Sequence, residues 1–250
     1  MRSRVVVLWL GLALLATACG NPPAHDTAPA TRDAGSRGPT GVLPAAGEAS
    51  PSPALRLANS RARFRGSIRV IDARTRARMV SWRPGCPVPI RDLRLLTLYH
   101  WGFDGTVKRG KLIVHEDVAG DVLSVFRRLF YARFPIRRMR LVDEYDANDD
   151  RSMAANNTSA FNCRKIRDSS RWSEHAYGWA IDINPVQNPY IRGNEVVPPA
   201  GKRYVDRSKR AKGMVHARDV VVRAFEAIGW GWGGYWRSSK DYQHFSLTGR

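Results

Sequence analysis

The amino-acid sequence predicts an α+β fold, a single domain in which a central antiparallel sheet is flanked by helices. Two segments carry apolar residues at helical spacing, and several shorter segments have the apolar and β-branched composition of strands. The connections between these segments are mostly short and rich in turn residues, as in antiparallel sheets. With 250 residues, the chain is long enough for a tail and one domain with a hydrophobic core.

The first half of the domain contains most of the predicted strands and the longer helix. Residues 64–71 have a strand-like composition, and residues 76–82 are their expected hairpin partner. Residues 93–101 and residues 112–114 are two further predicted strands, separated by a tight turn with an Asp-Gly pair. Residues 117–134 have apolar positions at helical spacing, and the proline that follows them ends the predicted helix.

The second half is expected to combine short strands, loops and a final helix. Residues 139–145 predict a strand, and residues 146–152 predict a polar loop after it. Residues 184–190 are rich in Pro and Asn, which is typical of loops that frame a cleft. Residues 219–228 predict an amphipathic helix that ends at a glycine.

The N-terminus predicts export from the cytoplasm. Residues 1–19 combine two early arginines with a short apolar run, as in a secretory signal peptide, and are too short for a comfortable membrane span. The small residues before Cys19 resemble a bacterial lipoprotein cleavage site, which would leave Cys19 lipidated; ordinary signal cleavage is the alternative. Residues 20–60 predict a disordered Pro/Ala/Gly-rich linker, and residues 61–250 predict the folded domain. We therefore expect either a cell-surface lipoprotein or a protein secreted to the cell wall.

The charge and the remaining cysteines fit this compartment. The formal net charge of +19 favours anionic partners. Export argues against nucleic acid as the partner and favours anionic wall polymers. The alternative is a basic surface that is merely solvated. We expect contact with the membrane only through a lipid anchor. Cys86 and Cys163 form an even pair in an exported chain, which predicts one disulfide, with two buried thiols as the alternative.

One stretch, residues 173–182, places a histidine and a carboxylate on a predicted turn and strand. His175 and Asp182 are seven positions apart, but Gly178 between them and the Asn-Pro pair that follows disfavour a helix. A turn that leads into a strand fits better. Asp182 lies between Ile181 and Ile183, which suggests a partly buried carboxylate, and a metal ion is among the strongest partners for such a group.

A second cluster near the end of the chain supplies the rest of a metal site. His244 is a third candidate ligand, and two histidines with one aspartate form a plausible zinc set that leaves one position for water. Asp241 is then the spare carboxylate that takes a proton from this water. The alternatives are a core imidazole beside Phe245 for His244 and a turn or cap residue for Asp241.

These motifs resemble those of a known family. The Ser-x-His and Asp pattern, followed by Asp-x-x-His, is similar to the zinc D-Ala-D-Ala carboxypeptidases, their dipeptidase relatives and the L-Ala-D-Glu endopeptidases. This group also includes lysostaphin and the hedgehog signalling domain. The resemblance covers roughly residues 137–245. It implies a zinc site on the sheet, with His175, Asp182 and His244 as ligands of Zn²⁺. It also implies Asp241 as the catalytic base, where many relatives carry Glu.

The resemblance further suggests that Arg164 holds or polarises the substrate. A guanidinium has the permanent charge and fork geometry for a carboxylate or a developing oxyanion. The alternatives are a surface arginine or an ion-pair partner of Asp182 or Glu174. Ser173 either binds substrate or supports His175, and its alternative is an N-terminal turn cap.

The expected function is zinc-dependent hydrolysis of peptidoglycan stem peptides. A D-alanyl-D-alanine carboxypeptidase is the favoured form, and an L-Ala-D-Glu endopeptidase is the alternative bond specificity. A non-catalytic cell-wall-binding zinc module is the alternative from another class. The expected partner in each case is the peptidoglycan stem peptide or the wall that contains it.

Overall fold

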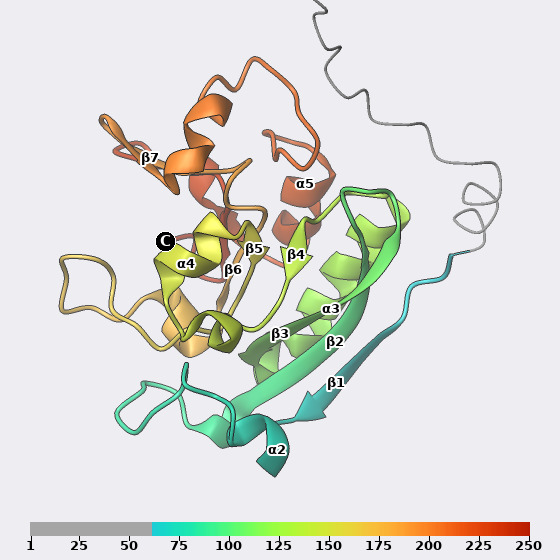
Figure 1. Ribbon diagram of the computed structural model, residues 1–250, viewed down its shortest axis with the longest axis vertical. Helices are drawn as coiled ribbons and strands as arrows, with labels where there is room; N and C mark the ends of the chain where they lie inside the picture. The colour runs from blue at the N-terminus through green and yellow to red at the C-terminus, as the bar shows by residue number, and fades with distance from the viewer. Residues whose placement is uncertain (1–61) are drawn as a thin grey trace, which may run out of the picture. The chain divides into compact units, whose positions relative to one another are not determined.

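The computed structural model describes residues 62–250, which form a mixed α/β structure with small antiparallel sheets and few helices (Figure 1). The α+β fold class is therefore confirmed, although the strands are divided among several sheets. The predicted signal peptide, the lipidation at Cys19 and the whole of the predicted linker lie outside the described residues. None of the described helices has the length and apolar character needed to cross a membrane.

The largest sheet is formed by three antiparallel strands in the order β1-β2-β3. Strand β1 is Gly66–Val70, β2 is Leu93–Trp101 and β3 is Val107–His115. Leu93 pairs with His115 at one end of the β2–β3 hairpin, and Trp101 pairs with Val107 at the other. The predictions for residues 64–71 and 93–101 are confirmed, and β3 extends further than the predicted residues 112–114.

Helix α3, Glu116–Tyr131, packs against this sheet and buries its apolar face in the main core. His115 caps its first turn by accepting a hydrogen bond from the backbone N–H of Asp117, and two acidic residues lie near the positive end of the helix. The helix stops three residues before the predicted end, and Arg133 just beyond it has a positive φ of 54°. The core-facing residues of the helix are Val118, Ala119, Val122, Val125, Phe126, Leu129 and Phe130.

The predicted hairpin partner at residues 76–82 is wrong. Strand β1 pairs with β2 instead, and residues Ala73–Arg76 form the short helix α2. Asp72 caps this helix by accepting a hydrogen bond of 2.7 Å from the backbone N–H of Thr75. This local cap stabilises helical rather than extended backbone directly after β1. The prediction of a strand rested on residue composition, which does not include such a cap.

The predicted strand and loop at residues 139–152 are also largely wrong. Only Arg138–Met139 form a strand, β4, which pairs in parallel with β5, Asn157–Thr158. A 3₁₀ helix follows at Val142–Tyr145, and the expected loop contains the start of helix α4, Asp149–Ala154. Asn148 caps α4 by accepting a hydrogen bond of 2.9 Å from the backbone N–H of Arg151.

Two small sheets near the end of the chain support the candidate site. In the first sheet β11, His244–Ser246, lies between β6, Ala180–Asp182, and β9, Gly231–Trp232. Helix α5, Val220–Glu226, adjoins this sheet, and its Phe225 stacks on Phe245 of β11 with ring centroids 4.2 Å apart. This confirms the helix predicted at residues 219–228.

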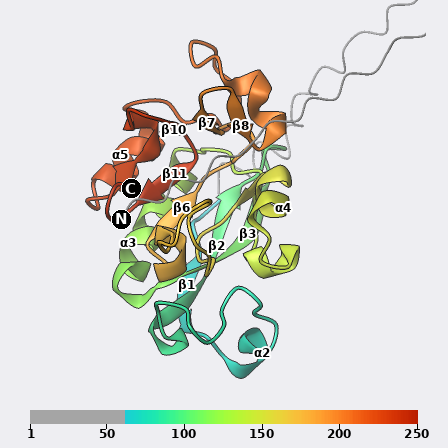
Figure 2. The ribbon, with the colours of Figure 1, turned by 90° about the vertical axis from the view of Figure 1, so that its left-hand side faces the viewer.

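The second small sheet has the order β10-β7-β8 and lies at the opposite end of the domain from α2 (Figures 1 and 2). Strands β7, Tyr190–Arg192, and β8, Glu195–Val197, form a hairpin. Strand β10, Lys240–Asp241, pairs with β7 so that Asp241 lies opposite Tyr190. Through this pairing, Asp241, the candidate base, lies beside the β7–β8 hairpin, which forms one wall of the cleft described below.

The predicted disulfide is present and joins Cys86 to Cys163, with Cα atoms 5.8 Å apart. It closes a loop of 77 positions in sequence. Around it lies a second apolar cluster that includes Met79, Val88 and Phe161. The bridge therefore connects the segment after β1 to the segment that leads to Arg164.

Removing this bridge should destabilise the domain. We expect Cys86→Ser combined with Cys163→Ser to lower the free energy of unfolding by about 2–4 kcal/mol, because the unfolded chain regains the entropy of a long open loop. Urea denaturation of the oxidised protein and the variant measures the difference, and the reduced wild-type protein serves as control. A variant as stable as the oxidised wild type would contradict this role.

Candidate metal centre and cleft

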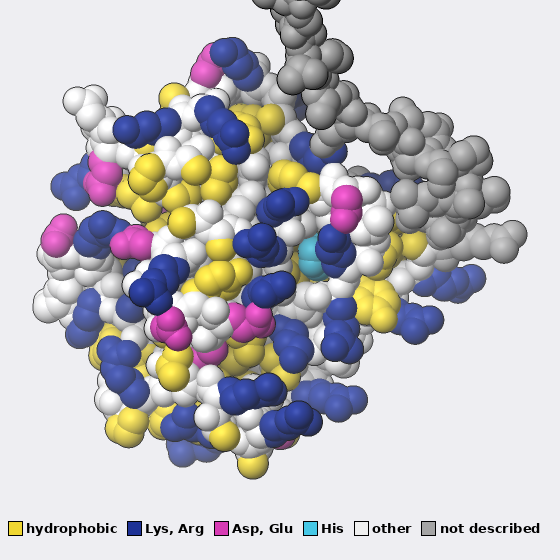
Figure 3. Space-filling view, viewed as in Figure 1, with side chains coloured by type: hydrophobic (Ala, Val, Ile, Leu, Met, Phe, Trp, Pro, Cys, Tyr) yellow, Lys and Arg dark blue, Asp and Glu magenta, His cyan; other side chains and the backbone are white. Residues whose placement is uncertain are grey.

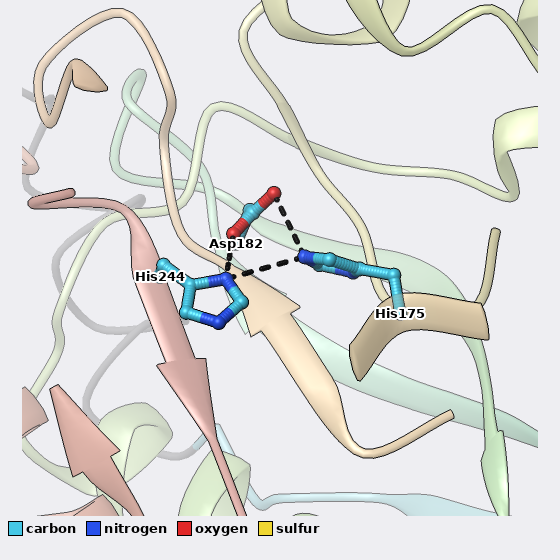
Figure 4. A group of neighbouring side chains, drawn as sticks. All are labelled: His175, Asp182 and His244. Atoms are coloured by element: carbon cyan, nitrogen blue, oxygen red, sulfur yellow. Dashed lines mark hydrogen bonds and ion pairs between the residues drawn. The ribbon is translucent and has the colours of Figure 1, made fainter. Parts of the chain in front are cut away.

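Three side chains from separate elements meet at one point, as Figure 4 shows. The Nε2 atom of His175 lies 3.2 Å from Oδ2 of Asp182, and the Nδ1 atom of His244 lies 3.1 Å from Oδ1 of the same carboxylate. The two imidazole nitrogens are 3.3 Å apart. All three residues are buried. Within residues 62–250, this is the one group of at least three His, Cys, Asp or Glu side chains close enough to hold a metal ion.

Local backbone structure brings these residues together. His175 lies in a 3₁₀ helix, Glu174–Tyr177, which ends at Gly178 with a positive φ of 74°. A Cβ atom at Gly178 would lie 2.6 Å from the backbone nitrogen of His115, so only glycine fits there. The chain then enters β6, where Asp182 pairs directly with His244 of β11. The predicted turn leading into a strand is confirmed.

The outer nitrogen of each imidazole is engaged by a backbone carbonyl. The Nδ1 atom of His175 lies 2.6 Å from the carbonyl oxygen of Ala160, and the Nε2 atom of His244 lies 3.0 Å from that of Arg250. When these nitrogens donate to the carbonyls, the remaining nitrogens present lone pairs toward Asp182. This is the arrangement by which proteins orient metal-binding histidines.

The spacing of the three inner atoms fits zinc. Four ligands at about 2.0–2.1 Å in a tetrahedron are separated from one another by about 3.3 Å. The separations of 3.1, 3.2 and 3.3 Å agree with this value. The donor types, two imidazoles and one carboxylate, match those of open zinc sites with a fourth position for water or substrate.

The electrostatics of the three residues favour a positive charge between them. Burial opposes ionisation of Asp182, but the two imidazoles outweigh it and hold the pKa of Asp182 well below its usual range. Burial also disfavours a charged His244, yet its hydrogen bond to Asp182 raises the pKa of His244 to about 9. Near neutral pH the metal-free site therefore carries a proton on His244, and a metal ion must displace that proton.

This proton makes zinc affinity depend on pH. Because His244 binds zinc only when deprotonated, and its pKa in the metal-free protein is about 9, the apparent dissociation constant should rise about tenfold for each unit that the pH falls from 8 to 6. Competition titrations with a chromogenic chelator measure this slope, after correction for the chelator's own protonation. An affinity that stays constant over this range would contradict the assignment of His244 as a ligand.

The metal residues lie in a cleft of about 890 Å³ that also contains Asp241. Burial, reinforced by the negative charge of Asp182, raises the pKa of Asp241 to about 7, although the positive charge on His244 opposes the shift. The Oδ1 atom of Asp241 is buried and has no hydrogen-bond partner among the described residues. A carboxyl group with a pKa near neutrality and a free oxygen has the properties of a general base.

Arg164 also lines this cleft, but its ion-pair partner differs from both alternatives named in the sequence analysis. Its Nη2 atom lies 2.7 Å from Oδ2 of Asp149 on α4, rather than near Asp182 or Glu174. Its Nε atom is buried and has no hydrogen-bond partner in the described part of the chain. Its Nη1 atom donates a hydrogen bond of 3.3 Å to the backbone carbonyl of Lys165, so the guanidinium is held at the wall of the cleft with its Nε–H unused.

Ser173 has the structural role that was the alternative to substrate binding. It caps the 3₁₀ helix, and its Oγ accepts a hydrogen bond of 3.3 Å from the backbone N–H of His175. The residue also lines the cleft, so support of His175 and contact with a substrate are compatible.

The cleft contains further residues that motif reasoning did not single out. Glu174 and Gln243 each line it with a buried oxygen that has no hydrogen-bond partner within residues 62–250, and the ring of Trp236 lies 5.5 Å from that of His244. Glu174 and Gln243 directly precede His175 and His244, the two candidate histidine ligands, in sequence. Their position next to the histidines was the only feature of the sequence that could have pointed to them, because neither residue belongs to the metal-binding motif itself.

Together, the fold and the cleft define a candidate metallohydrolase, with a buried His-Asp-His site beside a carboxyl group of raised pKa. Residues 167–247 match the model of a peptidase family described as D-alanyl-D-alanine carboxypeptidase. This match confirms the resemblance to the zinc D-Ala-D-Ala carboxypeptidase family over a part of the chain that contains His175, Asp182, Asp241 and His244. It supports a zinc peptidase with a peptidoglycan-related substrate. Neither the curated proteins nor the solved structures compared with the chain gave a match.

Proposed function

We propose that this chain is a zinc-dependent D-alanyl-D-alanine carboxypeptidase that acts on the stem peptides of peptidoglycan. The observation that carries the proposal is the convergence of His175, Asp182 and His244 in a cleft that also contains Asp241. The family match supports the reaction class, a zinc peptidase that acts on peptidoglycan, and the D-Ala-D-Ala bond is part of our proposal.

Each proposed step uses a residue of this cleft. His175, Asp182 and His244 would hold zinc, which would supply a Lewis acid and activate a water molecule for attack near neutral pH. Asp241 accepts a proton from the attacking water and returns it to the leaving amine. The guanidinium of Arg164, held by Asp149, donates toward the negative charge that develops on the carbonyl oxygen.

The extent of the cleft supports a peptide substrate of several residues. It reaches from Asp149 and Met153 on α4, past the metal residues, to Tyr190 and Val197 on the β7–β8 hairpin. Because residues from both α4 and the β7–β8 hairpin line it together with the metal residues, the same cleft is compatible with cleavage inside the stem. An L-Ala-D-Glu endopeptidase is therefore the second candidate.

The test uses the purified chain, loaded with zinc, and muropeptides that carry the pentapeptide stem. We expect mass spectrometry to show loss of one terminal D-Ala, which a chelator stops and added zinc restores. Cleavage between L-Ala and D-Glu would replace the carboxypeptidase by the endopeptidase. Intact stem peptides after incubation with protein that binds wall material would indicate a non-catalytic binding module.

The location and the surface of the protein fit a wall substrate. The disulfide and the family match support an extracytoplasmic protein, for which we propose either lipidation at Cys19 or secretion. Lys and Arg side chains are spread over the face shown in Figure 3 and outnumber the acidic side chains there. We propose that this basic surface contacts anionic wall polymers, an interaction that weakens as salt is added.

A further inference from the structure

Buried polar atoms without hydrogen-bond partners are concentrated at the cleft. Among the described residues, the six such side-chain atoms include four on residues that line the cleft. These four are Nε of Arg164, Oε2 of Glu174, Oδ1 of Asp241 and Oε1 of Gln243. Because buried polar atoms in native proteins are nearly always paired, this concentration marks the cleft as the place where bound water or a ligand that displaces it completes their hydrogen bonds.

Gln243 is the most deeply buried of these four residues, with 2% of its surface exposed. Its backbone carbonyl accepts a hydrogen bond of 2.9 Å from the N–H of Ile183, which fixes it beside β6. Its amide nitrogen lies 3.6 Å from the sulfur of Met153. Since the nitrogen end is placed against α4, the amide oxygen is left without a partner in the cleft.

Helix α4 arranges Gln243 and Arg164 along one wall. Asp149 and Met153 are four residues apart on this helix and therefore share one face. Asp149 forms the ion pair with Arg164, and Met153 contacts Gln243. The same helix face thus supports a charged donor and a neutral acceptor, both with unused hydrogen-bonding capacity.

We propose that Gln243 is a substrate-binding residue, whose Oε1 accepts a hydrogen bond from a backbone N–H of the bound peptide. A peptide group presents a carbonyl oxygen and an N–H, and the proposed roles of zinc and Arg164 serve only the carbonyl. An amide oxygen accepts from a neutral N–H without adding negative charge beside Asp182 and Asp241. This inference rests on the proposed function, because it requires a peptide in the cleft.

The experiment compares two buried glutamines. Gln243→Met keeps an unbranched side chain of similar size and removes the acceptor. Gln187→Met is the matched control, because Gln187 is 4% exposed, does not line the cleft, and accepts a hydrogen bond of 2.7 Å from Asn156. Both variants and the wild type are tested as full chains for melting temperature, zinc content and affinity for an N-acetylated stem pentapeptide.

The two substitutions should have opposite effects. We expect Gln243→Met to change the melting temperature little, since only the weak contact of its amide nitrogen with the Met153 sulfur and its interaction with Asp241 are lost, and to weaken peptide binding about threefold to tenfold. We expect Gln187→Met to lower the melting temperature by roughly 2–4 °C and to leave peptide binding unchanged. Equal affinity in wild type and Gln243→Met, or lower stability as the only effect, would overturn the proposal.

Peptides with an ester in place of one non-scissile amide identify the hydrogen bond itself. For one such ester peptide, the wild type should bind as weakly as Gln243→Met binds the all-amide peptide. Gln243→Met itself should bind this ester peptide and the all-amide peptide equally well. If every ester peptide affects both proteins equally, Gln243 accepts no N–H from the substrate. Affinities are measured on metal-free protein, where hydrolysis does not interfere, and repeated as KM with zinc. A difference in binding without any hydrolysis would refute the proposed activity but retain the role of Gln243.

Discussion

Asp241→Asn should lower kcat on stem peptides by about 10²–10⁴-fold while the protein still binds one zinc ion. Asparagine has nearly the same shape as aspartate but does not accept a proton from water, so the loss reports on the base. The metal ligands are untouched because Asp241 lies on β10, whereas they lie on β6, β11 and the 3₁₀ helix before β6. Steady-state kinetics and zinc analysis of the same sample measure both quantities.

Asp241→Glu is the control for this prediction, and it should retain more activity than Asp241→Asn because it keeps the carboxyl group. Full recovery is not expected, since a Cβ atom on neighbouring Gly233 would lie 2.6 Å from the backbone oxygen of Asp241, which indicates close packing. Wild-type turnover by zinc-loaded Asp241→Asn would assign the proton transfer to another group. The pH profile provides a second readout.

Burial raises the pKa of Asp241 to about 7 in the metal-free protein, and the positive charge of a bound metal lowers it. The base must be ionised to accept a proton, so activity should fall as the pH drops through this pKa. The acid limb of the kcat/KM profile is therefore expected at or below about pH 7 and above the usual range for aspartate. A profile that is flat down to pH 4 would contradict the assignment.

The half of the candidate metal site that contains His175 and Asp182 was predictable from sequence because its constraints are local. Gly178 and the Asn-Pro pair exclude a helix between His175 and Asp182, and the isoleucines beside Asp182 indicate burial. Spacing alone did not show that Asp182 faces His244, since that contact depends on the register of β6 and β11. The motif resemblance supplied this long-range information.

Helix α4 was not predictable by the same means. It is six residues long, and its first turn contains Asp149, Asp150 and Arg151, so it lacks the apolar repeat that identifies α3 and α5. Its stability comes from the Asn148 cap and from contacts made after folding. The ion pair of Arg164 and the buried position of Gln243 depend on this helix, and therefore both were missed.

Arg164→Met should lower kcat by about 10²–10³-fold with little change in zinc content, the magnitude expected when one donor to a developing oxyanion is removed. Methionine preserves much of the length and the apolar stem but removes the charge and all donors. The Nε atom, which is buried without a partner, is the donor available for the substrate. Kinetics on the pentapeptide stem, with zinc analysis of the same sample, measure the effect.

The ion pair with Asp149 provides the control that separates catalysis from structure. Asp149→Asn keeps the Arg164 charge and a hydrogen-bond acceptor on α4, and the pair is partly exposed, with side-chain exposures of 31% for Arg164 and 22% for Asp149. If the guanidinium acts on the substrate, Asp149→Asn should reduce kcat less than about tenfold, far less than Arg164→Met does. If both variants lose activity equally, Arg164 acts by anchoring α4, and oxyanion stabilisation must come from the metal alone. Because α4 also contacts Gln243, a purely structural role of Arg164 would weaken peptide binding as well as turnover. A catalytic role would instead leave the affinity of the metal-free protein for the peptide nearly unchanged.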